Sequence, residues 1–347
     1  MTFPPRPCLV VGLALTALLA GCGGSGKSAQ TPNTAGVTPS PSASPRPSSA
    51  APTTPSGGLD PLTGLAPRGA SPVVVLKIDN APLARPYQRG LSQAAILFEE
   101  VVEGGSTRML AVFDNGFSGE VGPVRSVRES DPELLGQLGP VALGFSGGNS
   151  GVTAGFHAVV RAGRIFDASY DAFPGLYRLG ERRADARNFF TTPGRLAAAL
   201  PAATKVRDSG LRFGAPVGGS PAASATTSFS AQSTVRVVYS ASTGRWTVFQ
   251  DGRQMSDYAP ANIIFQQVQV RASQYSDVHG ENTPYTVSVG SGQATVLRDG
   301  VRADGMWKRG ATGAVTRYVD KTGKDLLLRP GPTLVLLIPA GRPLTVG

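Results

Sequence analysis

Short runs of β-branched and aliphatic residues dominate the pattern between residues 73 and 113. The run Val73–Leu76 continues into Lys77-Ile78-Asp79-Asn80, which predicts a buried strand that ends in polar groups. A second apolar block begins at Ile96, meets Gly104-Gly105 and returns from Thr107 to Phe113. Two such runs on either side of a glycine-containing loop predict a β-hairpin.

Helical segments are predicted after this hairpin. Ser130-Asp131-Pro132 combines an N-cap residue with a proline in the first turn, which predicts a short helix over residues 133–138. A further buried strand and two further helices are predicted over residues 141–145, 152–160 and 192–200. Strands that alternate with helices predict an α/β or α+β domain over residues 59–205.

Beyond residue 234 the pattern changes to short strands separated by turn residues. The predicted strands cover residues 235–239, 245–249, 262–266, 285–289, 294–297, 316–319 and 333–338. Asp251-Gly252 and Asp299-Gly300 mark hairpin turns between some of them. The predicted fold class is therefore α+β. An N-terminal α/β domain (59–205) is followed by a loose connecting segment (206–233) and a mainly antiparallel β domain (234–347).

The first 58 residues follow a different pattern. Arg6 precedes the apolar run Leu9–Ala20, which is too short to span a membrane comfortably and ends in Gly21-Cys22. Small residues before a cysteine at this place resemble the lipobox of bacterial lipoproteins. They predict a signal peptide over 1–21, cleavage before Cys22 and diacylglycerol on its sulfur, which anchors a protein stably. The alternative is an ordinary signal peptide that happens to end near a cysteine.

A linker and a thiol-free mature domain are expected downstream. Residues 22–58 are rich in Pro, Ser, Ala and Thr, and such a composition predicts a disordered stalk. The chain has two cysteines, and Cys8 lies in the predicted signal peptide. The exported domain is therefore expected to contain no disulfide and to be stabilised by burial alone.

The formal net charge of +10 at first suggests nucleic acid or another anionic partner. The basic residues are dispersed along the chain, and arginine far outnumbers lysine, as in proteins from GC-rich genomes. Export also argues against nucleic acid as a partner. Anionic wall polymers and phospholipid head groups are the remaining candidate partners for this positive charge.

A set of ordered motifs resembles the YerB family of bacterial lipoproteins. The motifs are Asp60-Pro61-Leu62-Thr63-Gly64-Leu65, Ile78-Asp79-Asn80, Arg85-Pro86, Gly90–Ala94, Glu99 with Val102–Gly105, Thr107-Arg108 and Gly122–Arg128. Together these motifs extend the resemblance over roughly residues 59–345. It implies an envelope lipoprotein with an N-terminal and a C-terminal domain of unknown function. No enzymatic activity is established for that family, so the resemblance bears on localisation and architecture and not on mechanism.

The same motifs contain the densest polar cluster of the chain. The candidate binding residues are Asp79, Asn80, Arg85, Glu99, Glu103, Arg108, Arg125, Ser126 and Arg128. Arg125 and Arg128 stand just before a predicted helix, where the helix dipole and the guanidinium fork both favour anions. Such a site would suit a wall glycan carboxylate, a phosphodiester or a peptide C-terminus.

Several catalytic alternatives are open. Glu99 and Glu103 have even spacing, which would direct both carboxylates to one face of a strand for acid/base work. The same carboxylates could instead be neutralised by arginines in a structural network. Ser126 lies between two arginines but has no histidine base nearby in the sequence. The glycine-rich loop over 146–151 has the layout of an anion cradle, although a plain turn explains it as well.

Metal and cofactor sites are not expected. The chain has two histidines, His157 and His279, and no mature cysteine beyond the lipid-bearing one, so a zinc site lacks ligands. The alternating Asp277, His279 and Glu281 are expected to form a surface loop.

The leading hypothesis is a lipoprotein anchored through Cys22 on the outer face of the cell membrane. It would act as a non-catalytic module that binds an anionic cell-wall polymer or an envelope protein. The alternative hypothesis is a hydrolase or transferase that acts on envelope glycans or phosphoesters through Asp79, Glu99, Glu103, Arg125 and Arg128.

Overall fold

The computed structural model describes residues 58–68, 71–181, 186–206, 208–215, 218–255, 257–276 and 280–347. The predicted signal peptide, Cys22 and almost all of the predicted linker lie outside these ranges, as do Asp277 and His279. Within the described ranges, the helices are all too short or too polar to cross a membrane.

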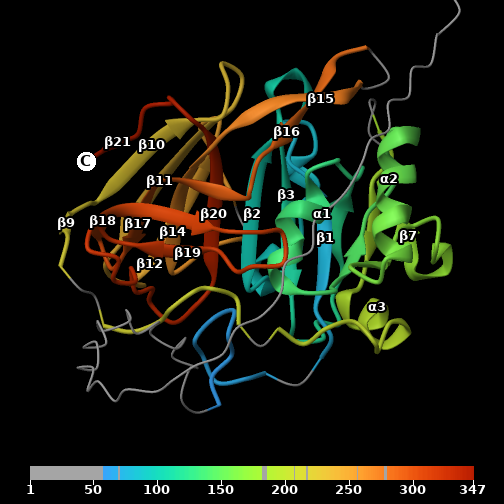
Figure 1. The fold of residues 1–347 in the computed structure, drawn as a ribbon, viewed down its shortest axis with the longest axis horizontal. Helices are drawn as coiled ribbons and strands as arrows, with labels where there is room; N and C mark the ends of the chain where they lie inside the picture. Colours follow the sequence, from blue (N-terminus) through green and yellow to red (C-terminus); the bar gives the residue numbers. More distant parts are fainter. Residues whose placement is uncertain are drawn as a thin grey trace, which may run out of the picture. The chain divides into compact units, whose positions relative to one another are not determined.

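The elements up to residue 215 combine strands with all the α-helices of the described residues (Figure 1). The strands are β1 (Val74–Asp79), β2 (Ile96–Val101), β3 (Thr107–Phe113), β4 (Val121–Val124), β5 (Ala142–Gly144), β6 (Phe166–Asp167), β7 (Tyr177–Leu179) and β8 (Phe189–Thr191). The α-helices are α1 (Asp131–Leu135), α2 (Ser150–Arg161) and α3 (Pro193–Ala199). Short 3-10 turns are η1 (Arg85–Tyr87), η2 (Leu91–Gln93), η3 (Glu103–Gly105), η4 (Gly136–Leu138) and η5 (Pro174–Leu176).

The described elements after residue 218 are strands. They are β9 (Ser220–Pro221), β10 (Ser224–Ser228), β11 (Thr234–Ser240), β12 (Arg245–Gln250), β13 (Arg253–Gln254), β14 (Asn262–Val268), β15 (Val270–Ser276), β16 (Asn282–Thr286), β17 (Gly290–Arg298), β18 (Val301–Arg309), β19 (Arg317–Val319), β20 (Thr333–Pro339) and β21 (Thr345–Val346). The fold is thus rich in β-structure, with few helices and mixed sheets.

Three sheets organise these strands. The largest has 14 strands and runs β19-β18-β17-β14-β20-β2-β3-β1-β4-β8-β7, with β5, β6 and β9 attached at its sides. A five-stranded sheet runs β13-β12-β11-β10-β21, and β15 pairs with β16 alone. Figure 1 shows β20 next to β2 in the middle of the molecule. Because β20 pairs with both β2 and β14, the largest sheet contains strands from residues 59–205 and from residues 234–347.

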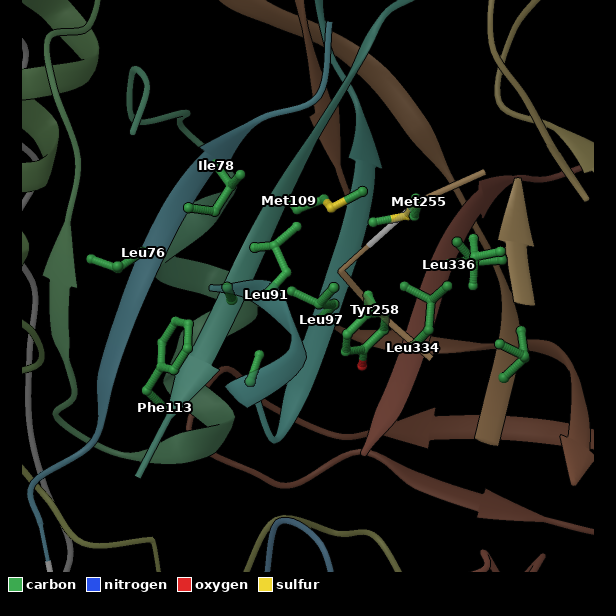
Figure 2. Close-up of a cluster of buried hydrophobic side chains, with 14 of the residues drawn as sticks. Leu76, Ile78, Leu91, Leu97, Met109, Phe113, Met255, Tyr258, Leu334 and Leu336 are labelled. Carbon is green, nitrogen blue, oxygen red and sulfur yellow. The ribbon is translucent and has the colours of Figure 1, made fainter. Parts of the chain in front are cut away.

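The central strands are buried on both faces, which explains their unbroken apolar runs. One face carries Leu76, Ile78, Leu97 and Met109, and Figure 2 shows these side chains in one apolar cluster with Met255, Tyr258 and, from β20, Leu334 and Leu336. The opposite face carries a second apolar cluster that includes Val75, Phe98, Leu110 and residues of α1 and α2. Side chains at alternate positions therefore enter two separate cores.

The predicted hairpin is confirmed, because β2 and β3 pair antiparallel around the turn η3. The predicted helices are also present, with α1 continued by η4 and α2 beginning two residues earlier than expected. Part of the segment expected to be a loose connection instead forms β10. Its sequence of small polar residues hides an alternation in which Ala225 and Thr227 are buried against the sheet.

Candidate functional site

A row of charged residues crosses three neighbouring strands on the face that carries α1 and α2. Asp79 of β1 is in register with Arg108 of β3, and Arg108 is in register with Glu100 of β2. All three side chains are at least nine-tenths buried. Charges are costly to bury unless they are paired, so each member of this row must have a partner.

Asp79 lies between two arginines. Its Oδ1 is 3.1 Å from Nη1 of Arg108, and its Oδ2 is 3.2 Å from Nε of Arg125. Burial lowers the pKa of Arg108 to about 10, although the Asp79 carboxylate opposes this change. Arg125 directly follows β4, and its backbone N–H donates to the carbonyl of Lys77, which places its side chain beside Asp79. Asp79 therefore forms an ion pair with both arginines.

Arg128 has a different environment, because each of its three side-chain nitrogens donates a hydrogen bond. Its Nε and Nη2 donate to Oε2 of Glu103 at 3.1 and 2.6 Å, and its Nη1 donates to the carbonyls of Ser126 and Val127. Thr283 of β16 donates to the other oxygen of Glu103. Burial opposes the ionisation of Glu103, but Arg128 and Thr283 outweigh it and lower the pKa of this carboxyl. Arg128 therefore joins the η3 turn to the loop before α1.

A cavity of about 620 Å³ opens beside these arginines. Its charged lining consists of Arg108, Arg125 and Arg128 together with Glu103 and Glu281. Arg125 is 30% exposed, and its Nε forms the ion pair with Asp79 but no hydrogen bond within the described ranges. Nε of Arg108 is buried and likewise has no hydrogen-bond partner within the described ranges. The cavity is thus lined by a partly exposed arginine, Arg125, and by a buried one, Arg108.

The glycine-rich loop and the start of α2 complete this cavity. Gly148, Asn149 and Ser150 line it together with Ser126. Asn149 caps α2 by accepting from the N–H of Gly151 at 2.8 Å, and its Nδ2 donates to the carbonyl of Ser276 in β15. The positive end of the α2 dipole therefore faces the same space as the arginines. The sequence pointed to the arginines and to the loop separately, and the fold brings them together.

A second cavity of about 650 Å³ adjoins the first and shares Arg128 and Val152 with it. Tyr275, Tyr285 and Gly155 are part of its lining. Gly155 lies in the middle of α2, where a Cβ would meet nothing within 4 Å. The packing of the protein therefore does not require a glycine at this position.

Three of the predicted site residues lie elsewhere. Glu99 faces the opposite side of the sheet, where its oxygens accept from Asn80 and Gln250. Arg85 is next to this group and pairs with Asp251 at 2.7 Å. Burial raises the pKa of Glu99 to about 7 despite these hydrogen bonds. Asn80, Arg85 and Glu99 therefore form a separate buried cluster against the β12–β13 turn.

The expectation that Glu99 and Glu103 share one strand face is wrong. Strand β2 ends at Val101, and Glu103 belongs to the η3 turn. The period of two holds only within a strand, so the even spacing does not carry past Val101. The two carboxylates bind different partners on different sides of the sheet and do not form an acid/base pair.

A buried triad of Lys77, Glu100 and Asp131 was not anticipated from the sequence. Lys77 Nζ is 2.5 Å from Glu100 Oε1 and 2.6 Å from Asp131 Oδ1. The run Val75-Leu76-Lys77 already indicated a buried lysine, because a residue two positions after a buried valine in a strand points into the same core.

The chain is similar to proteins of unknown function. A family model described as "Protein of unknown function (DUF3048) N-terminal domain" matches residues 62–207, and one described as "Protein of unknown function (DUF3048) C-terminal domain" matches residues 225–335. "Putative lipoprotein YerB" of Bacillus subtilis (strain 168) is 48% identical over 73 residues, which are 20% of this chain and 22% of the relative. The aligned stretch thus spans less than a quarter of that protein.

A solved structure shares the fold. The crystal structure of the YerB protein from Bacillus subtilis matches with a TM-score of 0.68 at 23% sequence identity. The match covers 83% of this chain and 99% of the solved one. At this identity the likeness concerns the architecture alone.

Proposed function

The chain belongs to the YerB-like DUF3048 family, whose function is unknown, and from this premise we propose that it is an envelope lipoprotein that binds an anionic ligand without catalysis. The lipid on Cys22 would hold it at the outer face of the cell membrane, and the segment 22–58 would act as a flexible stalk. The similarity to the Bacillus subtilis protein named "Putative lipoprotein YerB" supports a lipid anchor. The ligand would be a carboxylate or phosphate group of a cell-wall polymer or an envelope protein.

One observation carries this proposal. Arg125, which is 30% exposed, lines a cavity together with Arg108 and with Ser150 at the N-terminus of α2. Guanidinium groups and helix N-termini both favour anions, and a partly buried site strengthens both effects. Asp79 holds one edge of each guanidinium, so the arginines are already oriented before a ligand arrives.

The roles of the three arginines differ. Arg125 is the most exposed of them and is the principal ligand contact. Arg108 adds a second positive charge to the lining of the cavity, and Ser126 adds a hydroxyl group to it. Arg128 is bonded to Glu103 and to two carbonyls, so its role is to hold the wall in place. The adjoining cavity gives room for a ligand larger than a single anionic group.

The hydrolase or transferase hypothesis has less support. It requires Asp79, Glu99 and Glu103 to act at one centre. Glu99 is fully buried on the other side of the sheet, and Asp79 is fully buried between two arginines. Glu103 is neutralised by Arg128. Glu99 and Glu103, the two carboxylates that the hypothesis assigned to acid/base work, therefore do not meet in the cavity.

Thermal denaturation with and without anions tests the proposal. The protein is the chain from residue 22 onward, with Cys22→Ser so that no lipid is added. The probes are inorganic phosphate, acidic wall-polymer fragments and neutral glycan fragments of similar length. We expect the anionic probes to raise the midpoint of the parent chain and to leave Arg125→Ala unchanged, because a ligand stabilises only the state that binds it.

Arg161→Ala is the matched control, because it removes one exposed positive charge from the far end of α2. This variant should respond to the anions as the parent does. A shift that persists in Arg125→Ala, or the absence of any shift with every anionic probe, would refute the proposed site. An equal response to neutral glycans would show that charge is not what the site recognises.

A further inference from the structure

Lys77 has an environment that is unusual for a lysine. Its side chain is fully buried in the middle of the largest sheet. Nζ contacts Oε1 of Glu100 on β2 at 2.5 Å and Oδ1 of Asp131 on α1 at 2.6 Å. Both carboxyl groups are themselves at most 2% exposed. One amine and two carboxyl groups are thus in contact in a space that water does not reach.

The surroundings of this triad are mostly apolar. Leu110 is in register with Lys77, and Val75 precedes it on the same face. Arg108 is in register with Glu100, but its guanidinium bonds to Asp79 and to the carbonyl of Thr107. One cation with two carboxylates would leave a net negative charge in this core, which is costly. One of the two carboxyl groups is therefore expected to hold a proton.

The proton belongs on Asp131. Burial raises the pKa of Asp131 to about 7, and the neighbouring Glu100 adds to this, although Lys77 opposes it. Burial also works against the ionisation of Glu100, but contact with Lys77 and hydrogen bonding outweigh it and lower the pKa of that carboxyl. The triad is thus an ammonium group between a carboxylic acid and a carboxylate.

The remaining oxygens are oriented by hydrogen bonds. The backbone N–H of Arg128 donates to Oδ2 of Asp131 at 2.8 Å, and Ser130 Oγ donates to Oε2 of Glu100 at 3.1 Å. Oδ1 of Asp131 and Oε1 of Glu100 both face the amine. An N–H at Oδ2 would stabilise negative charge on that oxygen if the carboxyl carbon were attacked.

We propose that Lys77 and Asp131 condense into an intramolecular isopeptide bond, with Glu100 as the proton acceptor. Lys77 transfers a proton to Oε1 of Glu100, and the neutral amine attacks Cγ of Asp131. The Nζ–Cγ bond forms, the Cγ–Oδ1 bond breaks, and Oδ1 leaves as water after it receives a proton through Glu100. A free carboxylic acid would have to be chemically activated before an amine could attack it. Here the fixed contact between the reacting groups and the proton transfer through Glu100 lower the barrier instead.

The atoms and charges balance without a co-reactant. The ammonium of Lys77 and the acid form of Asp131 hold four acidic protons between them. The amide keeps one, the departing water takes two, and Glu100 keeps the fourth as a neutral carboxylic acid. The buried charges disappear, and the core gains a neutral amide that hydrogen-bonds to Glu100, which favours the condensed form.

The bond would link β1 covalently to α1, directly below the arginine cavity. Arg128 and Asp131 are three residues apart, and the N–H of Arg128 already bonds to Asp131. The mature chain has no cysteine besides Cys22, so no disulfide can provide such a link. A cross-link between residues distant in the sequence restricts the unfolded chain and raises stability.

Intact mass spectrometry under denaturing conditions tests this directly. The chain from residue 22 onward with Cys22→Ser should be lighter than its calculated mass by one water molecule. Fragmentation of a tryptic digest should find Lys77 and Asp131 in one branched peptide. Lys77→Arg should show the full calculated mass, and Asp131→Asn should lose ammonia in place of water. Glu100→Gln should show the full mass, because its amide cannot accept the proton.

Each result decides a part of the proposal. The full calculated mass for the parent chain would overturn the bond, even if the substituted chains failed to fold. A missing water that maps outside Lys77 and Asp131 would overturn the assignment to this pair. Condensation that proceeds unchanged in Glu100→Gln would overturn the role of Glu100. These outcomes are independent of ligand binding, so they do not depend on the proposed function.

Discussion

The clearest thermodynamic prediction concerns Glu99, the buried carboxyl group on the side of the sheet opposite the arginines. Its side chain is fully buried, and burial raises its pKa from 4.5 to about 7. Between these two values the folded chain keeps a proton that the unfolded chain has released. The free energy of unfolding therefore falls as the pH rises through this window, and the stabilising contribution is complete only below it.

The size of the effect follows from the pKa difference. Because the pKa rises from 4.5 to about 7, the free energy of unfolding falls by about 3 kcal/mol between the lower and the upper end of this pH window. Glu99→Gln removes the titrating group and keeps the shape. Gln250 Nε2 now donates to Glu99, while Oε1 of Gln250 has no partner among the described residues. A flipped Gln250 can therefore accept from the new amide.

Urea unfolding of the parent and of Glu99→Gln, from about pH 5 to about pH 8, measures this difference. We expect the variant to gain stability relative to the parent as the pH rises, by about 3 kcal/mol at the upper end. Repeating the series in about 1 M salt is the control, because salt screens surface charges and leaves a desolvated group unaffected. A pH-independent difference, or a variant that loses relative stability at high pH, would refute the reasoning.

Two further substitutions separate the roles of other residues. Arg128→Ala should lower the free energy of unfolding by about 3 kcal/mol, because it leaves the largely buried Glu103 carboxylate without its partner. Urea unfolding checks this, and a loss below about 1 kcal/mol would mean that the pair behaves like a surface ion pair. Gly155→Ala should raise stability by roughly 0.5–1 kcal/mol, since a Cβ in this part of α2 meets nothing. Thermal denaturation measures it, and a destabilised variant would show that the backbone at Gly155 needs its freedom.

Local signals in the sequence were sufficient for most elements of the first half. Glycines between two apolar runs predicted the β2–β3 hairpin, and Asn149 and Pro132 stand where α2 and α1 begin. These features depend on a few neighbouring residues, so a pattern of a few residues can identify them. Strand β10 was missed for the same reason, because its serines and threonines have the composition of a loop.

Contacts between distant parts of the chain could not be predicted in this way. No local pattern shows that β20 inserts beside β2, since pairing partners depend on the whole fold. In the candidate site, too, the local motifs could be predicted from the sequence but the contacts between them could not. The arginines and the glycine-rich loop were each recognisable, but their meeting at one cavity depends on how β4 and α2 pack. Glu103 was expected on the same strand face as Glu99 because the sequence does not show that β2 ends at Val101.

The insertion of β20 between β2 and β14 has a consequence for biogenesis. Until that strand is in place, β2 exposes a row of unpaired backbone amides and carbonyls at an open sheet edge. The earlier part of the chain therefore cannot complete its sheet until residues far downstream are available. Pairing across such a sequence distance is slow to form. The folding chain thus depends on keeping an aggregation-prone edge apart from other chains until the strand that covers it is in place.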